Sequence, residues 1–180
     1  MAAPIEIVLE VPGLVVLVGA AGAGKSTFVA RHFEPRDALS SDDLRAALTG
    51  DPGDQTATRP AFAILHRELV RRLRAGRLVV VDATNVRPFA RRALARRADS
   101  LGAPATAIVL DLPSGLIHAR NLARPRPVPI AAVDAQLAEL ARSVGAIEEE
   151  GFARVVVLRS PADVEAVRVV RAPGETAPAG

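Results

Sequence analysis

The sequence predicts an α/β fold in which helices cover both faces of a parallel sheet of about five strands. Short apolar runs of strand length alternate along the chain with longer segments of helical periodicity, which is the pattern of such a fold. Several of the runs are apolar at every position, as is typical of strands buried on both faces. The 180 residues, 49% of them hydrophobic, are enough to build one core and exclude a largely disordered chain.

The elements at the start of the chain lead to a glycine-rich turn. Residues 5–11 alternate weakly and predict a short edge strand, whereas the continuous apolar run at residues 14–18 predicts a buried strand. A helix is expected from about Gly24 to His32, followed by a short strand at residues 38–39 that ends near Ser41. We treat residues 1–12 as an N-terminal extension of a single domain at residues 13–171.

Glycine and proline punctuate the central elements. After a helix at residues 42–48, the Gly, Pro and Asp content of residues 49–59 predicts a loop. Pro60 suits the first position of a helix that carries apolar residues at helical spacing and ends at Gly76. The next elements expected are a strand at 78–81, a basic helix at 88–101 and a strand at 105–110.

The last third of the chain contains a predicted lid near residues 114–130. Ser114 suits the cap of a helix through Asn121, and residues 124–129 (RPRPVP) are too rich in proline to continue it. A long amphipathic helix then runs to Gly151, and a fifth strand is expected at residues 155–158. We expect residues 172–180 to form a disordered tail.

Composition narrows the class of protein. The absence of Cys excludes disulfides and thiolate metal sites, and the net charge of +3 alone does not argue for nucleic acid. No apolar run reaches the length of a membrane span, and Glu6 and Glu10 interrupt the apolar residues where a signal peptide would lie. We therefore expect a cytoplasmic protein that does not enter a membrane, and leave its oligomeric state open. Lys25 is the one lysine beside 22 arginines.

The turn after the strand at residues 14–18 fits the phosphate-binding pattern G-x-x-x-x-G-K-[ST] at every fixed position. Its small residues let backbone N–H groups curl around phosphates, and the following helix directs its positive end at them. Lys25 is expected to reach the β- and γ-phosphates and the Ser26 hydroxyl to bind Mg²⁺. A plain glycine-rich turn is the alternative, but the strand before and the helix after both favour ATP binding by Gly19, Ala20, Ala21, Gly22, Ala23, Gly24, Lys25, Ser26 and Thr27.

Two acidic residues follow strands whose carboxyl ends meet at this edge of the sheet. Asp42 is placed to accept the proton of an attacking hydroxyl; the alternative is that Asp42 or Ser41 caps the next helix, a role that Asp42 could combine with the first. Arg45 shares a helix face with Asp42 and is a candidate for binding a phosphate of the acceptor; an ordinary solvated arginine is the alternative. Asp82 is a candidate for holding the Mg²⁺ shell, or for a simple turn hydrogen bond.

Arginines in the lid are candidates for stabilising charge on the transferring phosphate. Arg120 and Arg124 have i, i+4 spacing and project from one face if the helix persists that far. An abundance of arginine in the chain as a whole is the alternative explanation. Arg126 follows in the proline-rich segment, which suits a semi-rigid moving piece.

Taken together, four motifs in order resemble the 5′-kinase domain of bacterial polynucleotide kinase–phosphatases and of phage polynucleotide kinase. They are the phosphate loop, Ser40-Ser41-Asp42-x-x-Arg45, Asp54-Gln55-x-x-Thr58, and Val81-Asp82-Ala83-Thr84-Asn85. The resemblance implies that Asp42 is the general base, that Arg45 contacts the acceptor's phosphate and that Arg120 and Arg124 act in the lid. The segment at residues 124–129 is one residue shorter than the lid usual in that family, which leaves Arg126 without an assigned role.

Three functions remain compatible with the sequence. The first is an ATP-dependent kinase of the 5′-hydroxyl of a DNA or RNA end, the second a small-molecule kinase acting on a nucleoside, sugar or antibiotic, and the third an ATP-binding module without transferase activity. The basic helix at residues 88–101 could follow a polynucleotide backbone, but it is interpreted as a solvated face, because no aromatic residues are interleaved to stack bases. Its arginines and the preceding one are Arg87, Arg91, Arg92, Arg96 and Arg97.

Overall fold

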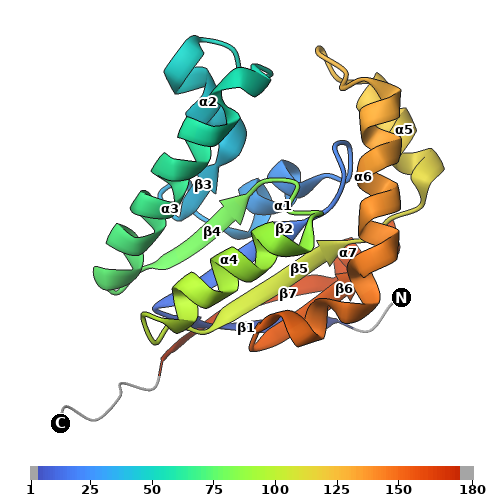
Figure 1. Cartoon of the computed structure of the whole chain (residues 1–180). Coiled ribbons are helices and arrows are strands. Elements are labelled where there is room, and N and C mark those ends of the chain that lie inside the picture. The colour runs from blue at the N-terminus through green and yellow to red at the C-terminus, as the bar shows by residue number, and fades with distance from the viewer. Residues whose placement is uncertain (1–3, 175–180) are drawn as a thin grey trace, which may run out of the picture.

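A computed structural model describes residues 4–174 and contains a parallel sheet of five strands in the order β3–β4–β2–β5–β6 (Figure 1). This confirms the predicted fold class. All four neighbouring pairs are parallel, so the carboxyl ends of the strands lie at one edge. The strands are β2 (Gly13–Val18), β3 (Ala38–Ser40), β4 (Leu78–Asp82), β5 (Ala105–Leu110) and β6 (Arg154–Leu158).

Helices connect these strands close to the predicted positions. The helix after the phosphate loop begins at Lys25, one residue later than predicted, and ends at the predicted His32. The helix predicted from Pro60 begins two residues earlier, and the predicted long helix ending at Gly151 changes to a 3-10 helix at Val144. A short helix, α7, was not predicted, although Ser160 and Asp163 form a capping box at its start. The helices are α1 (Lys25–His32), α2 (Ser41–Thr49), η1 (Gln55–Ala57), α3 (Thr58–Arg74), α4 (Pro88–Asp99), α5 (Ser114–Leu122), α6 (Ile130–Ser143), η2 (Val144–Glu150) and α7 (Pro161–Ala166).

The core has two halves, one on each face of the sheet. In β2, Leu14 and Val16 pack into the half formed with α3, α4 and η2. Val15 and Leu17 pack into the half formed with α1, α5, the start of α6 and the strands at the two ends of the chain. Because every residue of β2 is buried, its apolar run is explained by burial on both sides.

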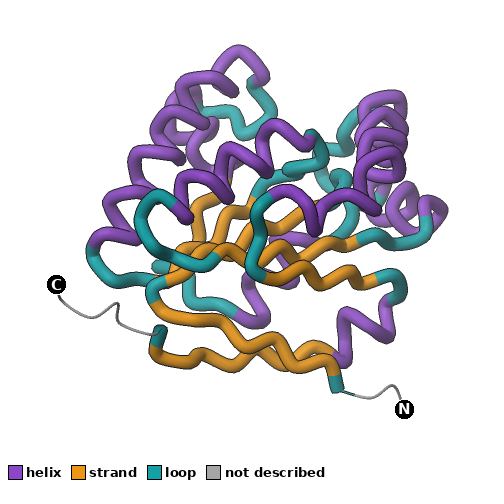
Figure 2. Tube along the Cα trace, turned by 60° about the horizontal axis from the view of Figure 1, so that its bottom comes forward, coloured by secondary structure: helices purple, strands orange, loops and turns teal. Residues whose placement is uncertain are grey.

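A second, two-stranded sheet pairs the ends of the chain, as Figure 2 shows beside the main sheet. Strand β1 (Ile5–Val11) runs parallel to β7 (Val167–Pro173) instead of forming an edge of the main sheet. Because Ile7 and Leu9 are buried in the core, residues 5–11 are part of the packed fold, not an extension. The predicted disordered tail starts too early, since β7 includes residues 172 and 173; residues 175–180 lie outside the described part of the chain.

The basic helix α4 is not uniformly solvated. Arg91 is fully buried, and its guanidinium makes a bidentate ion pair with Glu150 of η2, at 2.6 and 2.7 Å. It also donates to the carbonyl oxygens of Asn85 and Val86, so it joins α4, η2 and the β4–α4 connection. Of the helices within residues 4–174, none has the length and apolar character needed to cross a membrane.

Candidate nucleotide and acceptor site

The phosphate loop lies at the carboxyl edge of the sheet, between β2 and α1 (Figure 1). Gly22 and Gly24 both adopt left-handed backbone conformations, with φ of 90° and 94°. A Cβ atom at Gly22 would lie 2.6 Å from the carbonyl oxygen of Ile117 in α5, far inside van der Waals contact. The loop therefore requires glycine at both positions, although only Gly24 of the two is a fixed position of the phosphate-binding pattern.

Lys25 is buried in this loop and central to the site. Its ammonium group donates to the carbonyl oxygens of Gly19 and Ala20, at 2.8 and 3.0 Å. Burial lowers its pKa to about 8, against the opposing effect of the carboxylates of Asp82 and Asp42. Arg124 also lowers this pKa. The fold thus brings the predicted phosphate-binding, acidic and lid residues within electrostatic reach of one another.

Asp82 ends β4, close to Ser26. Burial raises the pKa of Asp82, and the nearby Ser26 hydroxyl and the charge of Lys25 partly offset the shift. A hydroxyl and a carboxylate side by side beside a phosphate-binding loop fit Mg²⁺, which prefers a few oxygen ligands in addition to phosphate oxygens. Residues 4–174 contain no group of three or more acidic or histidine side chains that could hold a metal ion.

Asp42 lies in the first turn of α2 and does not cap it. The cap is Ser40, whose hydroxyl accepts from the backbone N–H of Asp43 at 3.2 Å. The alternative in which Asp42 or Ser41 is the cap is therefore wrong. The carboxylate of Asp42 remains half exposed, at 54%, and free to meet a ligand.

Arg45 holds Asp42 in place. Its guanidinium forms an ion pair with the Asp42 carboxylate and donates through Nε to the carbonyl oxygen of Pro52 at 2.7 Å. Since the side chain is only 11% exposed, Arg45 is not an ordinary solvated arginine. Contact with an acceptor phosphate stays a prediction.

The lid is the turn between α5 and α6. The buried Asn121 side chain closes it, accepting from the N–H of Val128 at 3.0 Å and donating to its carbonyl oxygen at 2.8 Å. Because α5 ends at Leu122, Arg124 does not continue its helical face, and the reasoning from i, i+4 spacing fails. Arg120 nonetheless reaches the phosphate loop, donating to the carbonyl oxygen of Ala23 at 3.4 Å.

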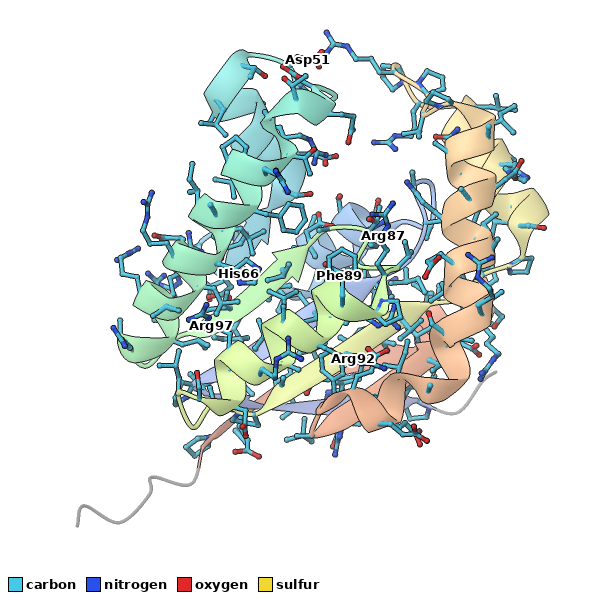
Figure 3. All side chains as sticks on the ribbon, in the orientation of Figure 1. Asp51, His66, Arg87, Phe89, Arg92 and Arg97 are labelled. Carbon is cyan, nitrogen blue, oxygen red and sulfur yellow. The ribbon has the colours of Figure 1, made fainter. Side chains whose placement is uncertain are left out.

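The tip of the lid meets the loop after α2. Arg126 lies 3.4 Å from the carboxylate of Asp51, labelled at the top of Figure 3, and both side chains are largely exposed. This contact joins the two segments that flank the phosphate loop. The sequence left Arg126 without a role, and its partner lies 75 residues away.

Two further side chains support the phosphate loop. The side chain of Gln136 in α6 accepts from the backbone N–H of Ala21 at 2.8 Å. Asn85 donates to the carbonyl oxygen of Leu17 at 2.8 Å and has a positive φ of 48°. Asn85 belongs to a motif noted in the sequence, whereas a single glutamine on an amphipathic helix gives no signal that could have identified it.

Solved structures with this fold include several kinases and related proteins. An RNA repair complex of Pnkp1, Rnl and Hen1 has 20% identity and a TM-score of 0.63, covering 81% of this chain and 47% of that one. A sugar kinase from Janibacter has 22% identity and a TM-score of 0.57, covering 82% and 84%. The PezAT toxin–antitoxin system of Streptococcus pneumoniae has 18% identity and a TM-score of 0.61, covering 82% and 66%.

These likenesses show a fold of the P-loop kinase type, and the chain spans about half of the length of the first of those structures. No curated protein matches the sequence closely enough to serve as a relative. A family described as an AAA domain matches residues 14–146, which include the phosphate loop, α2, Asp82 and the lid. Because the match covers well over half of the chain, the protein belongs to this AAA-domain family of nucleotide-binding P-loop proteins.

Proposed function

We propose that the protein is an ATP-dependent kinase that phosphorylates the 5′-hydroxyl of a DNA or RNA end. The observation that carries the proposal is the position of Asp42. Its carboxylate is half exposed, is not used as the helix cap, and is held by Arg45 within electrostatic reach of Lys25. A protein that only binds ATP has no need for a positioned carboxylate beside the phosphates. A kinase needs one to take the proton of the acceptor hydroxyl.

The transfer follows from these positions. Asp42 accepts the hydroxyl proton while the acceptor oxygen forms a bond to the γ-phosphorus, and the bond from that phosphorus to the β–γ bridging oxygen breaks to release ADP. When ATP binds, Lys25 leaves its contacts with Gly19 and Ala20 to bind phosphate oxygens. During the transfer, the lid residues Arg120 and Arg124 stabilise the charge on the transferring group. Mg²⁺, when held by Ser26 and Asp82 with phosphate oxygens, supplies neutralisation of the phosphate charge.

The choice of a polynucleotide over a small molecule is the finer part of the proposal. It is supported by the order of the four motifs in the sequence and by the fold shared with the RNA repair complex. The fold shared with a sugar kinase supports a small-molecule acceptor to a similar degree, so the acceptor has to be tested directly.

The test is transfer of labelled γ-phosphate from ATP with Mg²⁺ to a 5′-hydroxyl oligonucleotide, a matched 5′-phosphorylated oligonucleotide, and a panel of nucleosides and sugars. We expect label on the 5′-hydroxyl oligonucleotide alone and none with Lys25→Ala, which removes the ammonium group from the loop. Transfer to a nucleoside or a sugar alone would show that the acceptor is that small molecule and not a polynucleotide. Acceptor-independent ATP hydrolysis would overturn the assignment as a kinase.

A further inference from the structure

One face of α4 carries an exposed aromatic residue in line with two arginines. Phe89, Arg92 and Arg96 are spaced i, i+3 and i+7, so they lie on one side of the helix. All three are exposed, whereas Arg91 and Leu94 on the opposite side are buried in the fold. We call the row of Phe89, Arg92 and Arg96 the α4 stripe. It corrects the expectation that no aromatic residue accompanies the basic run.

The exposure of Phe89 sets it apart. It is 66% exposed, while the chain's other phenylalanines, Phe28, Phe33, Phe62 and Phe152, are buried or half-buried. A chain with 3% aromatic residues thus presents one of them to solvent. An exposed aromatic ring gains free energy from a partner that stacks on it, and nothing within residues 4–174 stacks on this ring.

The arginines of the stripe carry uncompensated charge. Arginines elsewhere on the surface, such as Arg71, Arg142 and Arg171, have carboxylates within 2.8 Å. Within residues 4–174, the side chains of Arg92 and Arg96 form no ion pair, and their hydrogen bonds are limited to the backbone, such as the Arg96 carbonyl oxygen that accepts from Ser100. Their charge is therefore available to an anionic ligand.

The stripe starts beside the phosphate loop. The carbonyl oxygen of Thr84 accepts from the N–H of Gly19, and Arg87 occupies the cap position of α4 three residues later. In Figure 3, Arg87 lies at the start of α4, at the end of the helix that is nearest the phosphate loop. The twelve residues of α4 span roughly 18 Å at the rise of an α-helix, enough for a few nucleotides.

We propose that the α4 stripe binds the single strand that continues from the acceptor end, with Phe89 stacking on a base and Arg92 and Arg96 contacting phosphates. The inference rests on the proposed polynucleotide acceptor. Stacking on an aromatic ring together with arginine–phosphate contacts is the usual combination for single strands bound without sequence preference. A duplex, whose bases are already stacked, gives Phe89 no partner.

The test is equilibrium binding of a fluorescent single-stranded 12-nucleotide oligothymidylate, measured by anisotropy without ATP over a range of salt concentrations. Phe89→Ala is expected to weaken binding by roughly fivefold to a hundredfold, and Phe89→Trp to preserve it. Arg92→Ser with Arg96→Ser is expected to reduce the slope of log affinity against log salt by about 1.4, from about 0.7 for each lost phosphate contact. Arg168→Ser, an exposed arginine on β7, is the matched control and is expected to change neither quantity.

Two results would contradict the proposed binding role of the α4 stripe: failure of the unmodified protein to bind the oligonucleotide, or equal binding by Phe89→Ala. Tighter binding of a blunt duplex than of the single strand would do the same. Phosphate transfer to a nucleoside 3′-phosphate, an acceptor too short to reach α4, separates this inference from the proposed function. If that transfer and oligonucleotide transfer are both absent while binding depends on Phe89, the proposed function fails and the stripe stands.

Discussion

Two arginine–carboxylate pairs in this protein differ in their surroundings. The pair of Arg91 and Glu150 lies between α4 and η2, with side chains 0% and 1% exposed, and Arg91 makes further hydrogen bonds to two backbone carbonyls. The pair of Asp42 and Arg45 lies in α2 at the edge of the sheet, with Arg45 11% and Asp42 54% exposed. The first is closed on all sides, whereas the second leaves its carboxylate open to a ligand.

The same type of interaction has a different role in each place: the buried pair fixes packing, and the half-exposed pair orients a carboxylate. A buried pair is satisfied only when both partners remain, so it fixes the packing of α4 and η2 beneath the site. The open pair contributes less to stability, because water solvates the half-exposed Asp42 carboxylate in any case. Arg45 can therefore orient Asp42 while leaving it able to accept a proton.

The largest effect on stability is expected from breaking the closed pair. Glu150→Gln leaves the Arg91 charge buried without a carboxylate and should lower the free energy of unfolding by about 3–5 kcal/mol. Urea denaturation followed by circular dichroism measures it. The matched change in the open pair, Asp42→Asn, should cost less than about 1 kcal/mol. Similar losses from both would remove the distinction between the two pairs.

Lys25 is buried like Arg91, but its ammonium group is bonded to carbonyl oxygens alone and not to a carboxylate. Its pKa of about 8 in the folded protein is below the 10.5 of a solvated lysine. Between these pH values the unfolded chain binds more protons, so stability rises with pH. Relative to Lys25→Met, the unmodified protein without nucleotide should gain up to about 3 kcal/mol from pH 7 to pH 10.5. Denaturant midpoints of the two proteins at several pH values measure this. A pH-independent difference would show that Lys25 is not desolvated.

The smallest effect is expected at the exposed contact between Arg126 and Asp51. Arg126→Ser should change the free energy of unfolding by less than about 0.5 kcal/mol, because both side chains are more than half exposed and their charges are screened. Thermal unfolding with and without added salt checks this. A loss above 1 kcal/mol that disappears in high salt would mean that the lid tip and the loop after α2 are more tightly joined than the exposure indicates.

The sequence predicted local features well, and long-range ones poorly. The phosphate loop, the burial of β2 and the position of Asp82 follow from patterns a few residues long, whose conformation is set by glycine and by strand periodicity. The sequence offered Asp42 or Ser41 as the cap of α2, whereas the cap is Ser40. All three neighbouring side chains suit that position, so the sequence alone does not separate them.

Features that depend on partners distant in sequence were missed. Strand β7 pairs with β1 across more than 150 residues, and no local signal sets that pairing. Within the basic run, charge alone does not separate the buried Arg91 from its exposed neighbour Arg92, because the separation depends on Glu150 and on the face that α4 turns to the core. The contact between Gln136 and Ala21 likewise depends on how α6 packs against the loop.

The central claim is that Asp42 is the group that deprotonates the acceptor. The most direct measurement is the rate of phosphate transfer from ATP to a 5′-hydroxyl oligonucleotide by Asp42→Asn and by the unmodified protein, both substrates being saturating. We expect the rate to fall by about 10²- to 10⁴-fold, with ATP affinity and unfolding midpoint nearly unchanged, because asparagine keeps the shape but cannot take a proton. A rate within about threefold of the unmodified protein would contradict the account.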